Sequence, residues 1–175
     1  MTPAHGGSRT LGVTIELPEE QRTELDAARE HYGAHDDDWP SHVTILAPIE
    51  ADDEVMPGVL AHLTAVAGRT APFRMRLRGT GSFRPVSSVV FVVVAEGISA
   101  CELLEGDVRS GDLGVESRFP YHPHVTLVHD RPEDVLERAF DDFAGYDAEF
   151  MVSSMHLHEN IDGQWTLVRE FPFGG

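Results

Sequence analysis

Apolar residues recur at strand and helix spacings along the first half of the chain. Residues 10–17 alternate apolar and polar side chains, a pattern typical of a half-buried strand. Pro18 and two glutamates follow, and then Leu25, Ala28 and Tyr32 keep helical spacing. Further along, the pattern predicts a strand over 42–48, a helix over 57–67 and a strand over 73–77.

The second half of the chain repeats this order. The pattern predicts strand 89–94, helix 99–109, strand 124–128 and helix 135–143, followed by strands over 149–158 and 164–171. Corresponding segments lie about 80 residues apart, so we predict an α+β fold of two βαβαβ halves related by a pseudo-twofold axis. We expect a single domain over 1–175, with lobes over approximately 10–85 and 86–171 and a central cleft.

A short motif occurs at corresponding positions of both halves. Its copies read His42-Val43-Thr44-Ile45 and His124-Val125-Thr126-Leu127. Residues i and i+2 of a strand point to one face, so each histidine shares a face with its threonine while the aliphatic residues point to the core. If the pseudo-twofold axis places these strands side by side, the cleft holds two imidazoles and two hydroxyls.

This set of side chains suits a phosphodiester. One neutral histidine can take a proton from an attacking hydroxyl or water, while the other, protonated, gives a proton to the leaving oxygen. The threonine hydroxyls can donate hydrogen bonds to the nonbridging oxygens. We therefore predict His42, Thr44, His124 and Thr126 as catalytic residues. The motifs are alike, so the sequence leaves open which histidine is the acid and which the base.

The charged residues exclude several classes of enzyme. All 13 basic residues are arginine, which rules out P-loop hydrolysis, protein kinases, ligation through an adenylylated lysine and pyridoxal chemistry. The net charge is −17, so we expect the field of the protein to repel membranes and long nucleic acids. Small substrates are favoured.

The cysteine count and the apolar runs indicate a cytoplasmic protein. Cys101 is the single cysteine, which excludes intramolecular disulfides and Cys-rich zinc sites and fits a reducing compartment. The longest apolar run, 89–95, is far shorter than the roughly 20 residues of a membrane helix. We expect a monomer with neither a membrane nor a protein partner.

The duplicated motif resembles that of the 2H phosphoesterase superfamily. Residues 119–127, with the sequence FPYHPHVTL, are similar to its 2′-5′ RNA ligase or RNA 2′,3′-cyclic phosphodiesterase branch. The resemblance implies the bilobal 2H phosphoesterase fold and cleavage of a 2′,3′-cyclic phosphate to a 2′-phosphomonoester without metal, ATP or another cofactor, sometimes with the reverse joining that makes a 2′-5′ bond. The expected partner is a small nucleotide or short RNA with a 2′,3′-cyclic phosphate or a 2′-5′ linkage.

Several other residues are candidates for substrate binding. Aromatic side chains can stack on a base, although single aromatics more often pack in the core; the candidates are Trp39, Phe83, Tyr121 and Trp165. Arginines can bind phosphate bidentately, although in an acidic chain they often neutralise neighbours; the candidates are Arg84, Arg118 and Arg131.

Two other functions are compatible with the sequence. A module of the same fold can bind a nucleotide phosphate with the four motif residues and lack turnover. Alternatively, a metal hydrolase can be built from two His-x-His pairs, His122 with His124 and His156 with His158. We favour the phosphodiesterase because it accounts for the duplication of the whole tetrapeptide.

Overall fold

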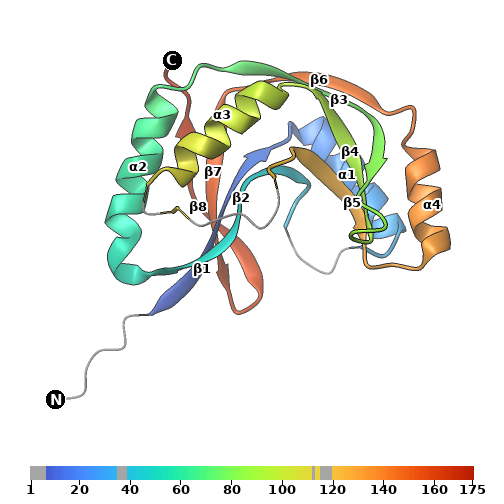
Figure 1. Cartoon of the computed structure of the whole chain (residues 1–175), viewed down its shortest axis with the longest axis horizontal. Helices are drawn as coiled ribbons and strands as arrows, with labels where there is room; N and C mark the ends of the chain where they lie inside the picture. Colours follow the sequence, from blue (N-terminus) through green and yellow to red (C-terminus); the bar gives the residue numbers. More distant parts are fainter. Residues whose placement is uncertain (1–6, 35–38, 112, 115–119) are drawn as a thin grey trace.

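Strands and helices follow one another along the chain nearly as the pattern predicts (Figure 1). The computed structural model describes residues 7–34, 39–111, 113–114 and 120–175. The elements in these ranges are β1 (Ser8–Glu16), α1 (Glu19–His31), β2 (His42–Asp52), α2 (Met56–Gly68), β3 (Phe73–Ser82), β4 (Val89–Glu96), α3 (Ile98–Arg109), β5 (His124–His129), α4 (Glu133–Asp142), β6 (Asp147–Val152), β7 (Ser154–Ile161) and β8 (Gln164–Pro172). A 3-10 turn, Asp53–Val55, precedes α2.

The residues at the helix starts explain where the helices begin. Pro18 and Pro132 precede α1 and α4, and each is followed by two acidic residues that complement the positive end of the helix dipole. Before α3, Gly97 adopts a φ of +98°, and a Cβ there would lie 3.0 Å from the carbonyl oxygen of Arg74. Glycine is therefore the residue that this turn tolerates.

Two antiparallel sheets of four strands carry the fold, which confirms the predicted α+β class. Their strand orders are β2-β1-β7-β8 and β5-β4-β3-β6. The central strands β1 and β4 correspond, and each pairs with a strand that bears the motif. The two sheets thus follow the predicted pseudo-twofold relation.

The sheets do not coincide with the predicted lobes over 10–85 and 86–171. Strand β3 of the first half belongs to the second sheet, and β7 and β8 of the second half belong to the first. The predicted strand over 149–158 is in fact two strands, β6 and β7, which end and begin around Ser153 and lie in different sheets. Repeat spacing shows which segments correspond, but it does not show with which strand each one pairs.

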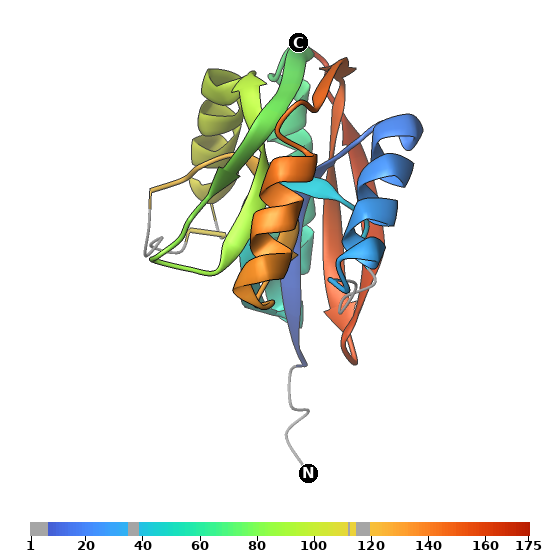
Figure 2. The ribbon, with the colours of Figure 1, turned by 90° about the vertical axis from the view of Figure 1, so that its right-hand side faces the viewer.

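The helices lie at two ends of the molecule. Helices α2 and α3 contact each other at one end, whereas α4 packs on β3, β4 and β5 and lies with α1 at the other (Figures 1 and 2). Buried apolar side chains of both sheets form one continuous cluster that includes Leu11, Val92 and Leu157. Among the described residues, no helix is long and apolar enough to cross a membrane.

Candidate active site

Strands β2 and β5 bring the two motifs to one cavity. The strands belong to different sheets but contact each other. Along each strand the motif histidine and threonine are half-buried, while the aliphatic residues between and after them are buried, as the alternation predicts. The cavity has a volume of about 180 Å³ and is lined by Arg29, Trp39, Ser41, His42, Thr44, His124, Thr126 and His129.

The two motif histidines are held in the same way. Nδ1 of His42 lies 2.7 Å from the carbonyl oxygen of Pro40, and Nδ1 of His124 lies 2.7 Å from that of His122. A carbonyl oxygen only accepts hydrogen bonds, so Nδ1 is the donor in both rings. In each histidine, Nε2 is therefore the nitrogen that can take up or release a proton.

The surroundings of the two histidines differ. The ring of His42 stacks on the indole of Trp39, with centroids 4.3 Å apart. The ring of His124 instead meets Phe83 and Phe91, at 5.0 and 5.1 Å. Burial lowers the pKa of His124, so its neutral form is favoured near neutral pH. The pseudo-symmetric site is therefore chemically asymmetric.

A bulge at the last residue of each motif, Ile45 or Leu127, changes the alternation of side chains. The pairing of β5 with β4 shifts between Val90 and Phe91, and Leu127 and Val128 are both buried. As a result, His129 faces the same cavity as His124. Strict alternation would have placed His129 on the opposite face, so sequence analysis missed it.

Helix α1 supports the segment that precedes His42. The amide and the hydroxyl of Ser41 both donate to Oδ1 of Asp26, at 2.7 Å. Arg29 donates from Nη1 to the carbonyl oxygen of Trp39, at 2.8 Å, and brings a positive charge to the cavity. Arg29 and Ser41 were also missed, because a helix that docks beside a strand leaves no signal in the motif itself.

Tyr121, in the segment that precedes β5, links this segment to β2. Its hydroxyl donates to the carbonyl oxygen of Thr44, at 2.8 Å, and its ring packs against the core. Burial raises the pKa of this hydroxyl. The structure uses the ring in packing and the hydroxyl in the link, and stacking of Tyr121 on a base stays a prediction.

The remaining predicted binding residues fall in different places. Trp39 is buried, stacks on both His42 and Trp165, and contributes to the lining of the cavity, so it supports the ring of His42. Arg84 pairs with Glu133 and Ser82, and Arg131 donates to the carbonyl oxygen of Gly33; the two side chains do not line the described cavity. Arg118 lies outside the described residues.

Phe83 lines a second cavity next to the first. This cavity has a volume of about 470 Å³, and its walls are Phe83, Val86, Ser87, Pro120, His122 and His124. Its lining is mostly apolar, and Val86 is 78% exposed there. His124 belongs to both cavities, so a group bound beside Phe83 lies close to the motif histidine.

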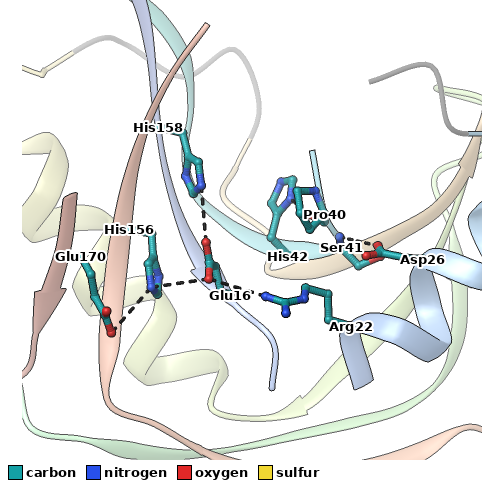
Figure 3. A network of polar contacts seen from close by, with 9 residues as sticks. All are labelled: Glu16, Arg22, Asp26, Pro40, Ser41, His42, His156, His158 and Glu170. Carbon is teal, nitrogen blue, oxygen red and sulfur yellow. Dashed lines mark hydrogen bonds and ion pairs between the residues drawn. The ribbon is translucent and has the colours of Figure 1, made fainter. Parts of the chain in front are cut away.

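The two His-x-His pairs do not come together as a metal site. His122 and His124 lie at the second sheet, whereas His156 and His158 lie on β7 in the first sheet, where both face Glu16 (Figure 3). Within the described ranges, no three His, Cys, Asp or Glu side chains are grouped so that they could hold a metal ion.

Comparisons with known proteins find a matching family and relatives that align over nearly the whole chain. A family model described as the 2′-5′ RNA ligase superfamily matches residues 17–164. A Geobacillus kaustophilus protein that carries the provisional name phosphoesterase is 27% identical over 167 residues, which cover 94% of this chain and 96% of the relative.

Solved structures show the same fold. The protein TT0787 of Thermus thermophilus is 27% identical with a TM-score of 0.69, and the match covers 95% of this chain and 98% of that one. E. coli LigT in complex with 3′-AMP is 21% identical with a TM-score of 0.69, over 97% of this chain and all 100% of that one. At the latter identity the likeness concerns the fold alone.

Proposed function

The chain belongs to the 2′-5′ RNA ligase superfamily and has the 2H phosphoesterase fold, and from this premise we propose that it is a phosphodiesterase that opens 2′,3′-cyclic phosphates. The observation that carries the proposal is the convergence of two His-x-Thr motifs on one cavity, with both Nδ1 atoms bonded to carbonyl oxygens. Two imidazoles supply the acid and the base, so the reaction needs no metal.

The asymmetry of the site supports distinct roles for the two histidines. His124 is favoured in its neutral form, so its Nε2 takes a proton from the attacking water. The water oxygen bonds to phosphorus as the bond from phosphorus to O3′ breaks. His42 gives the proton from its Nε2 to O3′, and the product is a 2′-phosphomonoester.

The hydroxyls of Thr44 and Thr126 bind the nonbridging oxygens of the phosphate. Each lies on the same strand face as its histidine and lines the same cavity. Donation to the nonbridging oxygens stabilises the negative charge that develops in the transition state. Arg29, at the wall of the cavity, adds positive charge to a protein whose net charge is −17.

The second cavity accommodates a base of the substrate. Its apolar lining and the Phe83 ring suit a planar aromatic group. A nucleoside held there would bring its 5′-hydroxyl to His124. In the joining reaction this hydroxyl gives its proton to His124 and attacks phosphorus in place of water, O3′ leaves with the proton of His42, and a 2′-5′ bond forms. Structures of E. coli LigT with 3′-AMP, NADP+ and ATP support nucleotides as the ligand class of this fold.

The substrate is a small nucleotide or a short RNA. Every phosphate added to a substrate raises its repulsion by a protein of net charge −17. The single fixed cation in the described lining of the catalytic cavity, Arg29, can offset only part of this repulsion. We therefore propose that cytoplasmic mononucleotides and short oligonucleotides are turned over faster than long RNA.

A panel of substrates tests the proposal. The protein is incubated with nucleoside 2′,3′-cyclic phosphates and 2′-5′ linked dinucleotides in the presence of a chelator, and the products are identified. We expect 2′-monophosphates. Saturable binding without a product would show that the protein is a nucleotide-binding module and not an enzyme. Loss of activity in chelator and its recovery with Zn²⁺ would show that the protein is a metal hydrolase instead.

A further inference from the structure

The face of the first sheet that carries His42 also carries a polar layer, made of Glu16 on β1 and the buried His156 and His158 on β7. In the first sheet, Glu16 on β1 is the cross-strand neighbour of His42, and Gly12 on β1 is the neighbour of His158 on β7. Directly paired residues point to the same face of a sheet. The histidines of β7 therefore lie on the face of the sheet that also presents the first motif.

His158 is fixed in this layer by one carboxylate. Its side chain is buried, and its Nε2 lies 3.5 Å from Oε1 of Glu16, while Nε2 of His156 lies 3.7 Å from the other oxygen of the same group (Figure 3). The described residues offer no hydrogen-bond partner to Nδ1 of His158. The polar contact that sets the orientation of its ring is thus the one with Glu16.

Trp39 connects His158 to the catalytic cavity. The indole stacks on His42 and lies against the ring of His158, whose centroid is 5.3 Å away. The backbone below is Gly12, where a Cβ would come within 2.8 Å of Cη2 of Trp39. Trp39 is therefore closely packed on the face of the sheet, between Trp165, whose centroid is 4.0 Å away, and His158. Removal of the His158 ring leaves a cavity beside the indole and so gives it room to shift.

We propose that His158 is a positioning residue for His42 and that it acts through Trp39. Glu16 orients the imidazole of His158, that ring supports the indole, and the indole holds the ring of His42 in the orientation in which Nδ1 donates to Pro40. The inference rests on the proposed function, because it assigns an effect on proton transfer by His42. Removal of His158 slows the chemical step and leaves phosphate binding at the two threonines intact.

Three variants measure this effect. In His158→Ala, we expect kcat to fall about tenfold with KM within about twofold of wild type, because a small displacement of a catalytic group costs rate. His158→Gln fills more of the volume and keeps a donor for Glu16, so it recovers part of the loss. His156→Ala is the matched control: His156 contacts the same carboxylate, and its ring centroid lies 6.4 Å from that of His158, but it makes no ring contact with Trp39 among those described. Its kcat stays within about twofold of wild type, because the His158 ring still supports the indole.

A double-mutant cycle decides whether the effect passes through His42. In the His42→Ala background, His158→Ala should cost no further activity, since the group that it positions is gone. Losses that multiply would overturn the proposal, as would a kcat of His158→Ala equal to that of wild type or of His156→Ala. If His158→Ala does not fold, the same cycle with His158→Gln decides. A wild-type protein that does not open cyclic phosphates would overturn the proposed function instead.

Discussion

The link between Tyr121 and Thr44 offers a test of how the two motif strands are held together. The change is Tyr121→Phe, which removes the hydroxyl that donates to the carbonyl oxygen of Thr44, at 2.8 Å. The ring remains to pack in the core. A hydrogen bond of this kind contributes about 1 kcal/mol, and the loss of a donor to a partly buried carbonyl oxygen adds to the cost, so we expect the free energy of unfolding to fall by about 1–2 kcal/mol.

The expected loss can be measured by thermal unfolding. For a protein of this size it corresponds to a fall in Tm of about 2–8 °C. The matched control is Tyr146→Phe, because the Tyr146 hydroxyl is buried and has no hydrogen-bond partner among the described residues. Its removal should leave Tm unchanged or raise it slightly. Equal shifts in Tm for the two variants would refute the reasoning, since they would show that the link contributes nothing.

Three further predictions concern the site. Burial lowers the pKa of His124, so the acidic limb of the kcat/KM profile, which reports loss of the neutral base, should have its midpoint below about 6.5; a flat profile from about pH 5 to 8 would contradict two-imidazole catalysis. Thr44→Ala and Thr126→Ala should each raise the activation free energy of the chemical step by about 2–4 kcal/mol, measured from kcat. Smaller losses would show that the threonines do not stabilise the transition state. Burial also lowers the pKa of His158, so the folded state binds fewer protons than the unfolded state, and stability is lost as the pH falls below about 6.5. His158→Gln removes this titration, so its Tm should fall less than that of wild type between about pH 7.5 and 5. Equal falls of Tm in the two proteins would contradict this.

The sequence predicts which side chains of the two motifs share a face because the signal is local. The i, i+2 spacing within each tetrapeptide determines which side chains share a face, whatever the strand pairs with. The duplication at about 80 residues adds that the two faces correspond. For these reasons the structure brings His42, Thr44, His124 and Thr126 together as the motif predicts.

Features that depend on pairing and packing could not be predicted. The exchange of β3, β7 and β8 between the sheets depends on which strand edges meet, and the repeat period carries no information on that. The bulge after Thr126 brings His129 into the cavity against the local alternation. Tyr121 lies in the segment before β5, and its link to Thr44 exists only once the two sheets have packed together.

The central claim is that two imidazoles alone supply the acid and the base. The most direct measurement compares wild type, His42→Ala and His124→Ala in the opening of a nucleoside 2′,3′-cyclic phosphate, in the presence of a chelator. The account predicts formation of the 2′-monophosphate by wild type and a loss of about 10²-fold or more in each variant. An unchanged rate in either variant would contradict it.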